Sequence, residues 1–388
     1  MIQVIALLAG ILLGIFSGLV PGIHSNTIAS VLSTLPIDPE AFAYIIVAVL
    51  GAHLVFQFFP SIFLSIPDDT VVASVLPGHR MALEGRGRQA LAVCAFSVML
   101  SAGASALLLP VSLVLLPIAF GAISPHMAII LVGASIYLLL SERAAGKIAL
   151  AAFVFLLSGA LGLATLRGAV NDPLFPSFSG LFAASGILLS FTQQRKIPRQ
   201  KKESTRLDFL PYVAAGVLFG MLSDLLPGIA APAQIAIFAS AILVTDDAKK
   251  FLALVSSIAA SHGVFAFAAL LSIGKAREGA LAIMNEIEPV MPSDLPALVG
   301  VLLVSIGVSA FLLMRLSKYA DRLQQIDTKK INLLVLAYLS CAVAIISGGA
   351  GLLVFATATA IGILPPLLGI RRTHVMGLII IPSILLSL

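Results

Sequence analysis

The amino-acid sequence predicts an all-α, polytopic membrane protein of about ten to twelve transmembrane helices, built as two homologous halves. Hydrophobic residues make up 60% of the 388 positions, and charged residues only 11%. Apolar runs long enough to cross a bilayer recur along the chain, and one segment near the N-terminus recurs after the middle. A soluble domain carries about 25% charged residues, so this chain is too poor in charge to cover itself with a water-facing surface.

The apolar runs follow one another with short polar connections, and each predicts a membrane helix. The N-terminal run lacks a basic region and a cleavage site, so we expect a retained first span and no signal peptide. The run 89–118 is longer than one upright crossing requires, and we expect Pro110 to bend it. The runs are residues 2–20, 41–64, 89–118, 126–141, 147–166, 178–193, 210–226, 249–273, 295–316, 331–347, 351–370 and 374–388.

Two loops rich in Lys and Arg predict which side of the protein faces the cytoplasm. Such loops beside membrane spans stay on the cytoplasmic side, so we expect a multi-pass protein of the cytoplasmic membrane. The pI of 9.3 then reflects topology, and no nucleic-acid partner is expected. The basic residues are Arg195, Lys196, Arg199, Lys201, Lys202 and Arg206 in the first loop, and Arg315, Lys318, Arg322, Lys329 and Lys330 in the second.

An internal duplication relates the two halves. Residues 9–23 (AGILLGIFSGLVPGI) and 215–229 (AGVLFGMLSDLLPGI) share nine of fifteen residues at an offset of 206. His53 and its following phenylalanines recur at His262 with an offset of 209. We therefore predict a first repeat over 1–193, a basic linker over 194–209 and a second repeat over 210–388. Whether the repeats are inverted depends on the number of spans in each, and we favour inverted repeats.

Both halves contain a Pro-Gly interruption at the same place in the duplicated segment. Backbone that leaves a helix at membrane depth is tolerated only around a cavity or within protein. Corresponding breaks in two repeats are the best pointer from sequence to a transporter's binding site. A helix that restarts after a break points its N-terminus, which attracts anions, at that site. The candidate substrate-binding residues at the two breaks are Pro21, Gly22, His24, Ser25, Asn26, Thr27, Pro227, Gly228 and Gln234.

Three acidic residues at membrane depth are candidates for ion coupling. Asp68 and Asp69 follow Pro67 and either bind a coupling cation, relay a proton or cap a helix in a water-exposed loop. Asp224 stands where the first half has Gly18, and it is either a proton or Na⁺ site or an interfacial cap. The coupling ion would be Na⁺ or H⁺, and we expect no other cofactor and no bound metal.

Two equivalent histidines and one lysine complete the candidate site. His53 and His262 occupy matching positions, which favours a shared role in lining the pathway; the alternative is that each is a packed, hydrogen-bonded residue of the core, as a histidine on an apolar face more often is. Lys275 follows a second interruption, Ile273-Gly274, and it and the nearby Arg277 either hold an anionic substrate or extend to the membrane interface.

The sequence carries no enzyme signature. Zinc-protease, serine-hydrolase and nucleotide-binding motifs are absent from the sequence, so we expect neither an enzyme nor an ATP-driven pump. Cys94 and Cys341 both lie in apolar runs, which predicts no disulfide framework.

Five motifs, in order along nearly the whole chain, resemble one known family, the TctA family of large permease subunits in tripartite tricarboxylate transporters. The breaks and their flanks read GLVPGIHSNTIASVL near the N-terminus and LLPGIAAPAQ at 225–234. The others read SIPDDTVVASVLPGHRMALEGRGRQAL at 65–91, DPLFPSFSGLF at 172–182 and GIRRTHVMGLIIIPSILL at the C-terminal end. The last is similar to the stand-alone archaeal branch of the family.

The resemblance implies a cation-coupled importer of di- or tricarboxylates that holds its substrate between the two Pro-Gly hairpins. This sequence departs from the family pattern at Pro67-Asp68, Ser261-His262 and Gly274-Lys275. These departures fall where the resemblance places the substrate, so the identity of the carboxylate stays open. The need for a periplasmic binding protein and the formation of a homo-oligomer also stay open.

Two other functions stand beside the permease. A polyprenyl-phosphate lipid carrier translocase would also use Pro-Gly hairpins, because a lipid phosphate suits a helix N-terminus as well as a carboxylate does. An intramembrane enzyme would use Asp68, Asp69, His53 and His262, but no complete motif supports it. A lipid carrier requires a lateral apolar groove, whereas a small anion requires a closed polar pocket.

Overall fold

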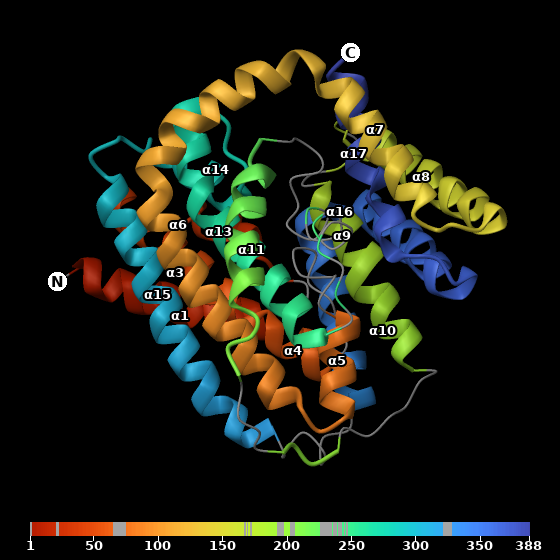
Figure 1. The fold of residues 1–388 in the computed structure, drawn as a ribbon, viewed down its shortest axis with the longest axis horizontal. Coiled ribbons are helices and arrows are strands. Elements are labelled where there is room, and N and C mark those ends of the chain that lie inside the picture. The colour runs from red at the N-terminus through yellow and green to blue at the C-terminus, as the bar shows by residue number, and fades with distance from the viewer. Residues whose placement is uncertain are drawn as a thin grey trace. The chain divides into compact units, whose positions relative to one another are not determined.

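The computed structural model describes the chain from Ile2 to Leu388, apart from a set of short gaps. Within the described residues all regular secondary structure is helical (Figure 1), which confirms the all-α prediction. The residues outside the description are 21–22, 65–74, 167, 169, 171–172, 192–197, 202–205, 226–234, 236–238, 240–242, 244, 246 and 321–327.

The chain packs as two compact units. The first comprises Met1–Gly121, Arg195–Leu225 and Ala230–Ile326, and the second comprises Ala122–Gln194, Leu226–Ile229 and Asp327–Leu388. The helices of the first unit are α1 (Ile2–Leu19), α2 (Ser25–Leu32), α3 (Pro39–Phe56), α4 (Phe58–Phe63), α5 (Val75–Leu83), nearly all of α6 (Gly87–Ile123), α11 (Leu210–Ser223), α13 (Ala248–Ile273), α14 (Gly279–Ile287) and α15 (Leu295–Leu316).

The second unit is built from helices that precede the linker and helices near the C-terminus. They are η2 (Ser124–His126), α7 (Met127–Leu140), α8 (Ala145–Thr165), α9 (Leu174–Phe178), the π-helical η3 (Ser179–Ala184), α10 (Ser185–Ser190), α16 (Thr328–Leu368), η5 (Arg372–Met376) and α17 (Gly377–Leu386).

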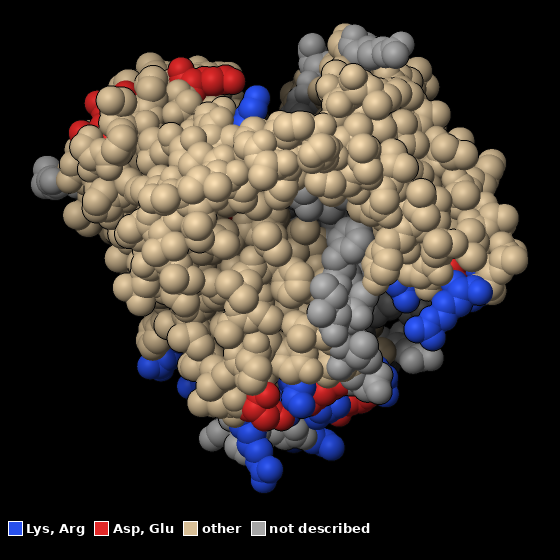
Figure 2. Space-filling model, turned by 45° about the horizontal axis from the view of Figure 1, so that its top comes forward, with Lys and Arg blue, Asp and Glu red and all other residues tan. Residues whose placement is uncertain are grey.

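Seven described helical stretches are long and apolar enough to cross a membrane, and three shorter apolar helices accompany them. Their outward sides carry large apolar side chains, such as Leu107 at 83% exposure and Ile345 at 84%, which suit contact with lipid. On the face in Figure 2, charged side chains gather at the margins and leave a broad band between them. The chain is therefore a polytopic membrane protein, as predicted, while the number of crossings within ten to twelve stays a prediction.

Two helix pairs form the core of the first unit, and they pack in the same way. α1 packs on α3, and α11 packs on α13. Gly14 of α1 lies against the carbonyl oxygen of Val49, and Gly220 of α11 lies against that of Ile258, so close that neither site has room for a β-carbon. Adding 206 to Gly14 gives Gly220, and adding 209 to Val49 gives Ile258. These are the two offsets of the sequence duplication, so the two contacts occupy equivalent positions.

Each helix pair of the second unit combines a helix from before the basic linker with a helix from after it. α8 packs on α17, and α16 packs on α9, η3 and α10. Gly162 of α8 lies against the carbonyl oxygen of Leu378, and Gly362 of α16 lies against that of Leu181. Each pair therefore joins one helix from before the linker with one from after it.

A second set of close contacts in this unit repeats the pattern. Gly377 lies against the carbonyl oxygen of Phe155, and Gly180 lies against that of Phe355. These matched contacts in both units are what an internal duplication leads us to expect. The division into repeats 1–193 and 210–388 nevertheless stays a prediction, since both stretches contribute to both units.

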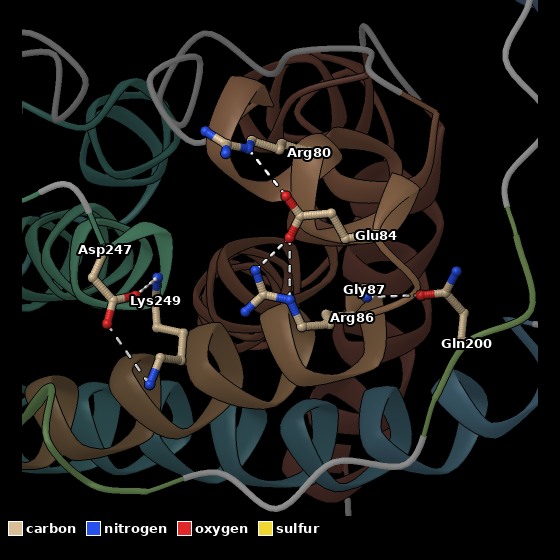
Figure 3. Close-up of polar contacts among 7 residues, drawn as sticks. All are labelled: Arg80, Glu84, Arg86, Gly87, Gln200, Asp247 and Lys249. Carbon is tan, nitrogen blue, oxygen red and sulfur yellow. Dashed lines mark hydrogen bonds and ion pairs between the residues drawn. The ribbon is translucent and has the colours of Figure 1, made fainter.

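The described part of the basic linker is fixed to the start of α6 (Figure 3). The buried Gln200 side chain accepts a hydrogen bond of 2.7 Å from the N–H of Gly87 and donates one of 3.1 Å to the carbonyl of Ala82. Because Gly87 is the first residue of α6, Gln200 pairs one of the N–H groups that a helix leaves without an intrahelical acceptor.

Charged side chains surround this contact at the edge of the unit. Glu84 pairs with Arg80 and Arg86, and Lys249 lies 3.7 Å from Asp247 (Figure 3). The hydrogen bond from Arg86 lowers the pKa of Glu84 below its ordinary value. The Arg80 side chain is 79% exposed, so this cluster lies in a solvated loop.

Candidate functional site

Polar side chains from both parts of the chain meet inside the first unit. They come from the start of α2, the end of α11, the middle of α13 and the residue before α14. α2 packs on α14 and α11 packs on α13, and this packing brings together segments that lie about 250 residues apart, as Ser25 and Glu278 do.

A serine holds the buried His262 ring in one orientation. The Ser223 hydroxyl donates its only hydrogen to the carbonyl of Gly220 at 2.6 Å. Its oxygen also lies 3.1 Å from Nδ1 of His262, and there it can only accept. Nδ1 of His262 therefore carries a hydrogen.

Asp224 lies beside the same ring nitrogen with its carboxylate fully buried. Its Oδ1 is 3.1 Å from Nδ1 of His262. The ring N–H is aligned with Ser223, however, so neither carboxylate oxygen has an aligned hydrogen bond from a described residue. A buried carboxylate without full hydrogen bonding is costly. Asp224 therefore requires positive charge from neighbouring groups.

Arg277 supplies positive charge next to Asp224. Its Nε donates to the backbone carbonyl of Asp224 at 2.9 Å. Burial lowers the pKa of Arg277, and the opposite charge of Asp224 acts against that change. A guanidinium stays protonated in proteins, so Arg277 brings one full positive charge to the cluster.

Glu278 connects His262 to the start of α2. Its Oε2 lies 3.7 Å from Nε2 of His262, and its Oε1 accepts a hydrogen bond of 3.3 Å from the Ser25 hydroxyl. The Asn26 side chain packs against Gly279, where there is no room for a β-carbon. Glu278 precedes α14 and Ser25 begins α2, so two helix N-termini lie at this contact.

The first helix pair repeats the serine–histidine contact. The Ser17 hydroxyl donates to the carbonyl of Gly14 at 3.1 Å and lies 3.0 Å from Nδ1 of His53. The His24 ring meets His53 edge to face, with ring centroids 6.1 Å apart. Gly18 occupies the place of Asp224, and a β-carbon there would collide with Phe56.

The structure brings together some of the predicted site residues and leaves others apart. Ser25, Asp224 and His262 join in one cluster, and His24 joins His53. Lys275 is exposed and stays apart from the described residues of the cluster, while Thr27 is half-buried on α2. The predicted end of the helix at Gly274 is confirmed, since Gly274 adopts the left-handed conformation (φ 68°) after Ile273. Pro21, Gly22, Asp68, Asp69, Pro227, Gly228 and Gln234 lie outside the described residues.

Two members of the cluster were missed as site residues from sequence. Ser223 was present in the duplication as the partner of Ser17, and its position one turn after Gly220 could have marked it. Glu278 has no such signal, because it lies in a polar connection and its role depends on contacts with His262 and Ser25. No group of three or more His, Cys, Asp or Glu among the described residues is arranged to hold a metal ion.

Comparisons with known proteins agree with the family resemblance seen in the sequence. The sequence pattern of the tripartite tricarboxylate transporter TctA family matches residues 4–377. An uncharacterized protein of Methanocaldococcus jannaschii is similar, with 28% identity over 408 residues that cover 99% of each chain. No solved structure matches the chain.

Proposed function

The chain belongs to the tripartite tricarboxylate transporter TctA family, and from this premise we propose a secondary active transporter that moves a small organic anion, a di- or tricarboxylate, with cation coupling. Its site of action in this proposal is the cytoplasmic membrane. Membership in a transporter family argues against an enzyme, and the apolar helices support a multi-pass permease.

The observation that carries the proposal is the contact between the starts of α2 and α14. Ser25 of α2 follows the first Pro-Gly break, and Glu278 follows the interruption at Gly274; their side chains meet at 3.3 Å. Helix N-termini expose N–H groups and a positive dipole end. Two of them at one buried polar cluster suit an anion whose charges are spread over several carboxylates.

We assign substrate contacts to the residues around these breaks. The substrate-binding candidates are Pro21, Gly22, His24, Ser25, Asn26, Thr27, His53, Pro227, Gly228, Gln234, His262 and Lys275. Asp68, Asp69 and Asp224 are the candidates for coupling to Na⁺ or H⁺. The structure describes Asp224, which is fully buried, and a buried ionisable group in a membrane protein is a functional candidate by default.

Uptake into proteoliposomes tests the proposal. The purified chain should accumulate labelled citrate or succinate when a Na⁺ or H⁺ gradient is imposed. Ser25→Ala should reduce this uptake by about tenfold, the effect of losing about 1.4 kcal/mol of binding, whereas Ser33→Ala at the exposed end of the same helix should not. Absence of accumulation for every carboxylate under both gradients would contradict the proposal. Uptake by the chain alone would also mean that a periplasmic binding protein is dispensable.

A lipid carrier translocase is the second candidate, and an apolar pocket of the first unit favours it. The pocket has a volume of about 420 Å³ and opens at the surface, where Phe96 and Phe311 are 40% and 57% exposed. Its lining is Ala92, Ala95, Phe96, Met99, Leu207, Phe209, Gly307, Ala310, Phe311 and Met314. Flipping of a labelled polyprenyl phosphate in vesicles, without carboxylate uptake, would favour this function.

A further inference from the structure

We propose that His262, Asp224 and Glu278 form a binding site for one exchangeable proton, carried on the His262 ring between the two carboxylates. The presence of this site stands on geometry alone. Its role as the coupling site rests on the proposed transport function.

The first step concerns the hydrogen on Nδ1 of His262. Because the Ser223 hydroxyl donates to Gly220, the ring must donate from Nδ1 toward Ser223 and Asp224. A neutral imidazole has a single N–H. In the neutral state Nε2 of His262 therefore presents a lone pair.

The second step concerns what Nε2 faces. Oε2 of Glu278 lies 3.7 Å away. A lone pair that faces a carboxylate is repelled, whereas an N–H that faces it is attracted. A second proton on the ring makes Nε2 a donor toward Glu278 as well, while Nδ1 keeps its hydrogen toward Ser223 beside the Asp224 carboxylate.

The third step is a count of charge. Among the described residues, the charged groups that act on His262 are Asp224 after α11, with Arg277 and Glu278 before α14. α2 contributes Ser25, which does not titrate in this range, to the same cluster. With His262 neutral, the two carboxylates and the guanidinium of these described groups leave one net negative charge beside the fully buried Asp224. One proton neutralises it, which removes the cost of uncompensated charge away from water.

The site connects proton occupancy to the first Pro-Gly break. When His262 is protonated, Glu278 is held between His262 and the Ser25 hydroxyl. When the proton leaves, the lone pair on Nε2 repels the Glu278 carboxylate. Glu278 is then held less firmly, and so is Ser25, which donates a hydrogen bond to it. The start of α2 is thereby sensitive to the proton.

The first helix pair offers an internal comparison. Ser17 and His53 repeat the Ser223 and His262 contact, but Gly18 replaces the carboxylate. Ser17→Ala thus removes the equivalent hydrogen bond without touching the charged cluster, and it serves as the matched control.

The test is nitrogen-15 NMR of histidine-labelled full-length protein in nanodiscs, with no substrate present. The ring signals of His262 are assigned by their absence in His262→Gln. Between about pH 4 and pH 10 we expect a change from one protonated nitrogen, Nδ1, to two. The pH at which the change occurs should differ from wild type in both Asp224→Asn and Glu278→Gln, and it should be the same as wild type in Ser17→Ala.

A ring of His262 that keeps one protonation state throughout this range in the wild-type protein would overturn the proposal, whether or not the variants fold. A titration that is the same in wild type, Asp224→Asn and Glu278→Gln would also overturn it.

A second measurement separates the site from its role in transport. In proteoliposomes that accumulate a carboxylate, Glu278→Gln should lose accumulation driven by a pH gradient but keep exchange of internal for external substrate. If the NMR titration is found and accumulation persists in Glu278→Gln, the proton site stands and its coupling role falls. If no carboxylate is transported by the wild type, the proposed function fails while the NMR result still decides the site.

Discussion

Single residues decide which of the two serine–histidine contacts carries charge. Ser17 with His53 and Ser223 with His262 could be predicted as equivalent from the two offsets in the sequence. That Asp224 would be fully buried, and that Glu278 would reach the same ring, could not be predicted, because burial and side-chain contacts depend on how α11, α13 and the residues before α14 pack.

A buried carboxylate in the second unit predicts an acid-sensitive contact. Glu142, in the turn between α7 and α8, accepts hydrogen bonds of 2.8 Å from the N–H of Arg371 and from Nε2 of His374. Burial raises the pKa of Glu142, but these two hydrogen bonds and the charges beside them lower it by more, so it lies below the ordinary value of 4.5. A carboxyl with a lowered pKa in the folded state stabilises the fold above its unfolded pKa.

We therefore expect the thermal unfolding temperature to fall as the pH drops below about 4.5 and through the folded-state pKa of Glu142. Glu142→Gln should cost about 1–3 kcal/mol at pH 7 and should show a weaker loss on acidification than the wild type. Scanning calorimetry of the detergent-solubilised protein between pH 7 and pH 3 measures both. Equal acid sensitivity in the two proteins would contradict the assignment to Glu142.

At the scale of helices, the apolar runs predicted most elements and misplaced their ends. The run 89–118 forms the longer α6, which continues through Pro110 without a break in the helix. The run 374–388 begins as the short η5 and becomes α17 only at Gly377. Hydrophobicity alone could not place these ends, because it does not register capping contacts such as that of Gln200 with Gly87.

The glycine contacts of the first unit predict unequal effects of adding a methyl group. Gly14→Ala and Gly220→Ala should each destabilise the protein by roughly 1–3 kcal/mol, because a β-carbon at either position meets a backbone carbonyl of the packed helix. Gly103→Ala on α6 has open space around it and should be neutral or stabilising by up to about 1 kcal/mol.

The measurement is the reaction of Cys94 with a thiol-specific dye during heating, in a background with Cys341→Ser because Cys341 is exposed. Cys94 is buried and becomes accessible only when the first unit unfolds. Similar midpoints for all three variants would mean that the close helix contacts do not limit stability.

At the scale of the whole molecule, the two basic loops predict the orientation of the protein in the membrane. α15 (Leu295–Leu316) is long and apolar enough for one membrane crossing, and the exposed Met291 and Lys318 lie beyond its opposite ends. In a background with Cys94→Ala and Cys341→Ser, we expect a membrane-impermeant maleimide to label Met291→Cys from outside intact cells and Lys318→Cys only after the cells are opened. The reverse pattern would place the two basic loops outside.

The helix pairs of the second unit predict that the halves require each other. We expect residues 1–201 and 206–388 expressed separately to be degraded, and the two fragments expressed together to purify as a complex, because α8 packs on α17 and α16 packs on α9, η3 and α10. Gly162→Leu should lower the yield of the co-purified complex, because it disrupts one of the contacts between the fragments, whereas Gly103→Leu should leave the yield unchanged. Stable, folded fragments on their own would contradict this interdependence.

This pairing of early with late helices imposes a delay during synthesis of the protein. Gly162 enters the membrane with α8, but Leu378, the backbone it must touch, is 216 residues further along the chain. At about 5–20 residues per second, a ribosome needs roughly 10 to 40 s to cover that distance. During this interval the glycine-lined side of α8 lacks its final neighbour, so α17 completes, long after α8 has been synthesised, a contact that α8 alone cannot form.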